Sequence, residues 1–128
     1  MKALLDTHAF LWWITNDSRL SARVLHLVRD PSASIFLSVA SGWEIAIKVG
    51  LGKLELTDNL NEFIQDQLTA NRIDVLSVQM NHALFVHKLP KHHRDPFDRL
   101  LVAQSLIEGV PLITSDPLIR QYPVQTIW

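Results

Sequence analysis

The stretch HRDPFDRLLVAQSLIEGVPLITSD, residues 93–116, contains a complete helix-to-strand unit. Asp95 is expected to cap a helix that begins at Pro96, because aspartate is favoured at the N-cap and proline at the first helical position. Gly109 suits the residue just after a helix, so the helix is predicted over 96–108. The apolar run VPLIT, residues 110–114, predicts a buried strand that ends just before Asp116.

The same alternation of strand and helix continues outward along the chain. Further strands are expected at 3–5, 34–38, 73–78 and, at the edge of the sheet, 124–128. Further helices are expected at 8–14, 19–30, 39–50, 58–72 and 81–89, with one or two helical turns at 117–122. The strand cores are continuous apolar runs, which is typical of parallel strands buried on both faces. The sequence therefore predicts a single α/β domain over 1–128, with a central parallel sheet of four to five strands and helices on both faces.

Composition narrows the possible functions. The formal net charge of −1 is not the basic surplus of a protein that coats nucleic acid by bulk electrostatics. The absence of cysteine excludes disulfides, thiolate catalysis and cysteine-ligated zinc. The N-terminal apolar run is too short for a signal peptide or a membrane helix, so a cytoplasmic location is expected.

Carboxylates mark the expected carboxyl ends of the strands. Asp6 follows the first strand, Glu44 lies on the helix after the second, and Asp116 follows the fourth. Asp98 lies in the first turn of the helix before that fourth strand. Ligands of parallel α/β sheets bind beyond the carboxyl ends of the strands, so these four acids are predicted to converge on one site.

Most of these acids also have an ordinary local explanation. Asp95, Asp98 and Asp116 suit the first turn of a helix, where the dipole favours negative charge. Glu44 and Lys48 form an i,i+4 pair, worth only about 0.3–0.5 kcal/mol if it is exposed. For Asp6, directly after a buried strand, no such routine role is expected. Each explanation is local, and none accounts for the convergence of all the acids.

A divalent cation would account for the convergence of these acids. Carboxylates gathered at one edge repel one another, and some of them would be protonated without a counter-charge. Mg²⁺ and Mn²⁺ prefer oxygen ligands and are usually held by a few carboxylates together with substrate phosphate. Such ions activate water and stabilise the leaving oxygen of a phosphodiester.

The ordered segments LLDTHAFLWW, SVASGWEIAIKVGLGKL, HRDPFDRLLVAQS and LITSD resemble the PIN domain, and within it the VapC-type toxins of toxin–antitoxin pairs. The resemblance covers essentially the whole chain. It implies a PIN fold and a Mg²⁺- or Mn²⁺-dependent endoribonuclease in which a metal-activated water cleaves RNA. The family's four acidic positions match Asp6, Glu44, Asp98 and Asp116, which are therefore the expected catalytic residues and metal ligands.

The resemblance also suggests supporting residues and partners. Asp95 is expected to act as a cap or to support the metal ligands, and Thr114, in preference to Ser115, is expected to orient Asp116 or a water molecule. The implied partners are an RNA substrate, a VapB-like antitoxin and a second copy of the chain in a homodimer.

Several side chains have two interpretations. A basic cluster precedes and follows Asp98, and its members either hold RNA phosphates or form a solvated loop: Lys91, His92, His93, Arg94 and Arg99. Trp12, Trp13 and Trp43 lie in apolar helical patterns, so core packing is expected for at least two of them, although tryptophan also stacks on bases.

Other protein classes are less compatible with the sequence. A response-regulator receiver needs an acidic pair after the first strand and a late lysine, whereas only Asp6 stands there and the last lysine is Lys91. A haloacid-dehalogenase-type phosphatase needs a second aspartate two residues after the first, where this chain has His8. A non-catalytic α/β binding or signalling module with an acidic metal site is the alternative function.

Overall fold

The computed structural model describes all 128 residues of the chain. The strands are β1 (Lys2–Leu5), β2 (Ser34–Ser38), β3 (Ile73–Leu76), β4 (Leu112–Ile113) and β5 (Thr126–Ile127). The helices are α1 (Thr7–Ile14), α2 (Ala22–Arg29), α3 (Val39–Gly50), α4 (Leu60–Ala70), α5 (Met80–Phe85) and α6 (Pro96–Glu108), with 3₁₀ turns η1 (Val86–Lys88) and η2 (Ile119–Gln121). No helix combines the length and the apolar character that crossing a membrane would need.

The five strands form one parallel sheet in the order β3-β2-β1-β4-β5. The chain builds outward from β1 to β3 on one side and then crosses to β4 and β5 on the other. The strand order therefore reverses between β1 and β4, and this is the position where parallel α/β sheets bind ligands. Asp6 and Asp116 follow these two strands, so both acids lie at the reversal point.

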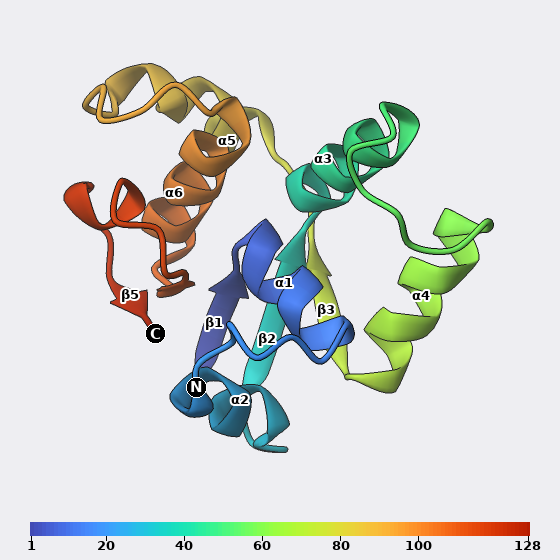
Figure 1. The fold of residues 1–128 in the computed structure, drawn as a ribbon. Helices are drawn as coiled ribbons and strands as arrows, with labels where there is room; N and C mark the ends of the chain where they lie inside the picture. The colour runs from blue at the N-terminus through green and yellow to red at the C-terminus, as the bar shows by residue number, and fades with distance from the viewer.

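Alternate residues of the strands supply two separate hydrophobic cores. Ala3 and Leu5 of β1 face a core shared with α1, α2 and α4. Leu4, between them, faces a second core shared with α6, η1 and η2. Figure 1 shows α5 and α6 on one side of the sheet and α4 on the other. The predicted parallel sheet with helices on both faces is confirmed.

Several elements have the same first and last residues as predicted from local sequence signals, and the others differ from the prediction at their ends. Strand β2 and helices α3 and α6 match the predicted 34–38, 39–50 and 96–108. The predicted helix 81–89 is wrong in its second half, where the chain tightens into η1 before Pro90. The predicted strand 110–114 is shortened to Leu112–Ile113, and the edge strand 124–128 to Thr126–Ile127. Trp12 and Trp13 pack partly buried against the first core, whereas Trp43 is 63% exposed.

Helix α6 ends at Gly109, which adopts φ +66°, a left-handed conformation that side chains with a Cβ disfavour. No atom would obstruct a Cβ at Gly109 or at Gly50, the last residue of α3, whose φ is not positive. We therefore expect Gly109→Ala to lower the free energy of unfolding by about 1–2 kcal/mol through backbone strain alone. The matched Gly50→Ala variant is expected to raise it by about 0.5–1 kcal/mol. Urea unfolding monitored by circular dichroism measures both, and equal effects of the two substitutions would contradict this explanation.

Candidate active site

Asp6 connects the end of β1 to the start of α1. It is 4% exposed and is the N-cap of α1, where its Oδ1 accepts a hydrogen bond of 2.7 Å from the Ala9 amide. The expectation that Asp6 has no routine structural role was therefore wrong, because the chain turns from strand to helix with no intervening loop. The cap fixes one carboxylate oxygen and aims the side chain along the carboxyl edge of the sheet.

Glu44 lies on the inward face of α3 and is also only 4% exposed. Its Oε2 accepts a 2.7 Å hydrogen bond from Lys48 Nζ, so the predicted i,i+4 pair is present. The pair is not an exposed one, because the carboxylate is buried. Glu44 Oε1 is buried and has no hydrogen-bond partner. An unpartnered buried carboxylate oxygen is costly, and a cation at that oxygen would remove the cost.

Two acids begin α6 and have different roles. Asp95 caps the helix, with its Oδ1 accepting hydrogen bonds from the amides of Phe97 at 2.9 Å and Asp98 at 3.1 Å. The predicted cap is therefore confirmed. The carboxylate of Asp98 accepts no hydrogen bond, and its side chain is 17% exposed. Asp98 is thus held near the others by the helix and not by a partner of its own.

Asp116 follows β4 and is anchored by its own turn. Its Oδ1 accepts a 2.8 Å hydrogen bond from the Leu118 amide. Its amide donates to Thr114 Oγ1 at 3.1 Å, and the fully buried Thr114 hydroxyl is also close enough to Asp6 to lower the pKa of that carboxyl. Thr114 therefore links the acids that follow β1 and β4. Ser115, between them, is half-buried.

The acids are close enough to change one another's protonation. Burial raises the pKa of the Asp98 carboxyl to about 8, and repulsion by four other carboxylates adds to the rise: Asp95, Asp6, Glu44 and Asp116. Burial also raises the pKa of the Asp6 carboxyl, although hydrogen bonds from Thr114 and Ala9 oppose this rise. The four acids that the sequence pointed to, separated by up to 110 residues, therefore surround one small volume.

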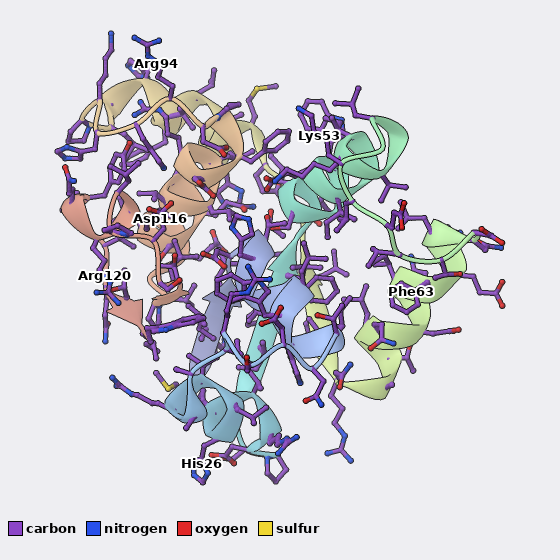
Figure 2. The ribbon with its side chains drawn as sticks, in the orientation of Figure 1. His26, Lys53, Phe63, Arg94, Asp116 and Arg120 are labelled. Atoms are coloured by element: carbon purple, nitrogen blue, oxygen red, sulfur yellow. The ribbon has the colours of Figure 1, made fainter.

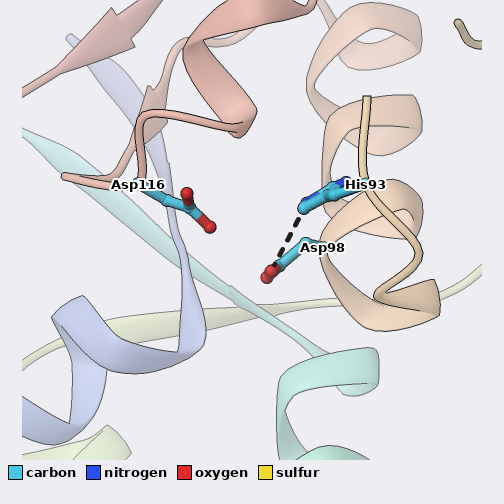
Figure 3. Close-up of side chains that lie close together, drawn as sticks. All are labelled: His93, Asp98 and Asp116. Carbon is cyan, nitrogen blue, oxygen red and sulfur yellow. Dashed lines mark ion pairs between the residues drawn. The ribbon is translucent and has the colours of Figure 1, made fainter. Parts of the chain in front are cut away.

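His93, one of the basic residues with two interpretations in the sequence, lies close to the carboxylates. His93, Asp98 and Asp116 each offer a ligand atom, and these atoms lie within 4.8 Å of one another (Figure 3). Asp6 and Glu44 are not part of this closest group, but both act on Asp98 electrostatically. Only the position of His93 two residues before the cap at Asp95 could have indicated its role.

The basic cluster does not act as one unit. The Arg99 guanidinium donates hydrogen bonds to the carbonyl oxygens of Pro90 at 2.8 Å and Val86 at 3.0 Å, and to the Tyr122 hydroxyl at 3.0 Å. It is therefore engaged within the protein and not free for phosphate, contrary to one interpretation of the sequence. Arg94, in contrast, is exposed, and Figure 2 shows it at the same end of the molecule as Lys53.

A groove borders the carboxylates. It has a volume of about 400 Å³ and is lined by Glu44, Lys48, Lys53, Arg94 and Phe97, among others. It places three cationic side chains beside one of the acids. A larger cavity of about 550 Å³ lies near the amino ends of β2 and β3, away from the carboxylates, and we do not associate it with the site.

The donor set fits a hard divalent cation. It consists of carboxylate oxygens with one imidazole nitrogen, and cysteine is absent. One buried oxygen of Glu44 lacks a partner, and burial together with the neighbouring carboxylates raises the pKa of the Asp98 carboxyl to about 8. Both features fit a site that receives a cation.

The chain is similar to known proteins over nearly its whole length. The PIN domain family model matches residues 3–124. Ribonuclease VapC22 of Mycobacterium tuberculosis (strain ATCC 25618 / H37Rv) is 25% identical over 130 residues, which covers 98% of this chain and 97% of the relative.

Solved structures share the fold over nearly the whole chain. A chain of VapBC2 from Rickettsia felis, bound to a DNA fragment from the promoter, superposes with a TM-score of 0.74 at 15% identity, covering 99% of this chain and 98% of that one. A chain of FitAcB from Neisseria gonorrhoeae gives a TM-score of 0.64 at 16% identity, covering 98% and 96%. A chain of VapBC-1 from nontypeable Haemophilus influenzae gives 0.64 at 20% identity, covering 99% and 97%.

The raised pKa of Asp98 predicts an unusual dependence of stability on pH. A carboxyl whose pKa rises on folding binds a proton more tightly in the native state, so its contribution is full below pH 4 and is lost as the pH rises to about 8. In EDTA, we expect the free energy of unfolding to fall over this window, by at most about 1.4 kcal/mol per pH unit. The Asp98→Asn variant is expected to show a much flatter profile.

The control is Asp66→Asn, which changes an exposed carboxylate on α4 and is expected to keep the wild-type slope. Hydrogen bonds lower the pKa values of Asp17 and Asp30. These two carboxylates therefore change the free energy of unfolding in the opposite direction, but they titrate below pH 4, outside this window. Urea unfolding at several pH values between 4 and 8 measures the slopes. A wild-type profile as flat as that of Asp98→Asn would contradict the crowding of the carboxylates.

Proposed function

The chain belongs to the PIN domain family, and from this premise we propose that it is a divalent-metal-dependent endoribonuclease, the toxin of a toxin–antitoxin pair. The observation that carries the proposal is the gathering of carboxylates around the buried Asp98, where burial first and repulsion by the neighbouring acids second raise its pKa to about 8. A fold that gathers four acids at the reversal point of a parallel sheet, and leaves one of their oxygens buried and unpartnered, is built around a positive charge. The similarity to Ribonuclease VapC22 supports RNA as the substrate.

Asp6, Glu44, Asp98 and Asp116 are the residues proposed to hold the cation, Mg²⁺ or Mn²⁺. When bound, such a cation acts as a Lewis acid that makes water nucleophilic at neutral pH and offsets the charge on a phosphodiester. The protein's contribution is to fix the ligands. Asp6 is fixed by the amide of Ala9 and Asp116 by that of Leu118.

Thr114 and Asp95 are proposed to position these ligands. Thr114 accepts a hydrogen bond from the backbone of Asp116 and lowers the pKa of the Asp6 carboxyl, so one hydroxyl acts on two acids. Asp95 fixes the start of α6 and thus the position of Asp98. Ser115 has a lesser proposed role, limited to orienting water or substrate at the edge of the site.

The groove beside Glu44 is proposed to receive the RNA backbone. Arg94 and Lys53 line it and are exposed, so they can contact phosphates without burying a charge. Lys48 lines it too, but is paired with Glu44. Arg99 is proposed to act indirectly, through the contacts that hold the loop before α6.

The proposed partners are a VapB-like antitoxin and a second copy of the chain. The names of the similar structures, VapBC2 and VapBC-1, support the first. An apolar strip formed by Trp43 and Ile47 of α3 and by Leu51, which caps the end of α3, is exposed and is available for either contact. Such a strip is a common mark of a protein interface.

The test is cleavage of a panel of structured RNAs by the purified protein in Mg²⁺, Mn²⁺ or EDTA. We expect cutting in the presence of metal only, and a loss of more than about 100-fold in Asp6→Asn and Asp98→Asn, because each removes a charge from the metal site. Asp66→Asn, on the outer face of α4, is expected to cut like the wild type. Equal cutting by all variants would refute the assignment, and metal binding without cleavage of any RNA would favour the non-catalytic binding module.

A second prediction concerns the hydroxyl of Thr114. Thr114→Val keeps the shape of the side chain but removes the hydroxyl that accepts from the Asp116 amide and lowers the pKa of Asp6, so we expect cleavage and metal affinity to fall by about 10–100-fold. Ser115→Ala, one residue away, is expected to change either quantity by less than about threefold. If the two variants behave alike, Thr114 does not position the acids in the way proposed.

A further inference from the structure

The imidazole ring of His93 has one buried nitrogen atom without a hydrogen-bond partner. The residue lies in the loop before α6, and its side chain is 7% exposed. Its Nε2 has no hydrogen-bond partner and lies 3.6 Å from Asp98 Oδ2, too far for a hydrogen bond. Figure 3 shows the imidazole directed toward the space that the Asp98 and Asp116 carboxylates also face.

The other imidazole nitrogen is held in a defined environment. His93 Nδ1 lies 3.0 Å from the hydroxyl of Tyr122, which is 3% exposed. That hydroxyl already accepts a hydrogen bond from Arg99 Nη1 at 3.0 Å. A hydroxyl oxygen has two acceptor positions, so it can also accept from His93 Nδ1–H. In that tautomer the lone pair of Nε2 is free and points at the carboxylates.

This arrangement is the usual environment of a metal-binding histidine. One ring nitrogen binds the metal, and the other donates to a fixed group that sets the orientation of the ring. Ligands of one ion, each about 2.0–2.2 Å from it, lie at most about 4.4 Å apart. The ligand atoms of His93, Asp98 and Asp116 already lie within 4.8 Å of one another, so small side-chain movements would bring all three to one ion.

We propose that His93 Nε2 is a direct ligand in the carboxylate site, and that this nitrogen makes the site select Mn²⁺ over Mg²⁺. The inference rests on the proposed function, since it deepens the nature of the same metal site. Both ions prefer oxygen ligands, but Mn²⁺ is a transition-metal ion and accepts an imidazole nitrogen more readily than Mg²⁺ does. Tyr122 and Arg99 are positioning residues that hold the imidazole in place.

The experiment uses Mn²⁺ as the probe on the full chain. Electron spin echo envelope modulation of the bound ion detects a directly coordinated ¹⁴N, and titration gives the affinities for Mn²⁺ and Mg²⁺. We expect ¹⁴N modulation in the wild type and its loss in His93→Gln. The same substitution is expected to weaken Mn²⁺ binding by about 10-fold and Mg²⁺ binding by less than about twofold.

Two other histidines supply matched controls. His92 is the exposed neighbour of His93, and His8 is exposed but close enough to Asp6 to lower its pKa. His92→Gln and His8→Gln are both expected to keep the ¹⁴N modulation. If His93→Gln fails to fold, wild-type protein grown with ¹⁵N-histidine replaces it, because the ¹⁴N modulation must then disappear and a ¹⁵N coupling must take its place.

The outcomes separate this inference from the proposed function. Mn²⁺ binding that depends on Asp98 but shows no histidine nitrogen, or that loses the nitrogen in His8→Gln, overturns the role of His93 and leaves the metal-dependent nuclease intact. Equal losses of Mg²⁺ and Mn²⁺ affinity in His93→Gln overturn the selectivity. Absence of any Mn²⁺ binding, or binding undiminished in Asp98→Asn, overturns both proposals.

Discussion

Repulsion between carboxylates at one edge of a parallel sheet is the constraint on which the rest of the structure depends. Each acid follows from the topology: Asp6 and Asp116 end the strands that flank the reversal point, and α3 and α6 bring Glu44 and Asp98 to the same edge. Burial strengthens the repulsion, because the charges are not screened by water. Burial and this repulsion together raise the pKa of Asp98 to about 8. Without a cation the site is therefore a destabilising feature that the two hydrophobic cores have to offset.

The fold holds these acids through short-range hydrogen bonds. Asp6 and Asp116 each accept from an amide two or three residues ahead, and Asp95 does the same beside Asp98. A cap of this kind contributes about 1 kcal/mol to stability and also fixes the direction of a side chain. The capping and ligand roles are thus compatible, since the amide takes one oxygen of the carboxylate and leaves the group otherwise available. Such anchoring keeps like charges close to one another when repulsion would separate them.

Local sequence signals made much of the fold predictable. Features that depend on long-range contacts were not predictable from the sequence. The Asp95–Pro96 start and the Gly109 end of α6 are encoded within a few residues, so the helix matches its prediction. The burial of Glu44 and the exposure of Trp43 were not predictable from α3 alone, because the apolar pattern does not say which face meets α1 and α6. The strand ends and the family resemblance both pointed to the four acids, but neither gave the distances between them nor their pKa values.

His93 shows why part of the site had to come from the structure. Its contacts are with Tyr122, 29 residues later, and Tyr122 is in turn bound by Arg99 on a third segment. In the sequence His93 lies between two exposed side chains, His92 and Arg94, and looks like part of a solvated loop. Arg99 fastens that loop by its backbone carbonyls, which turns one histidine inward while its neighbours stay in water. A residue for which the sequence left phosphate binding and a solvated loop equally open is therefore placed among the carboxylates, and Arg99 of the same basic cluster helps to hold it there through Tyr122.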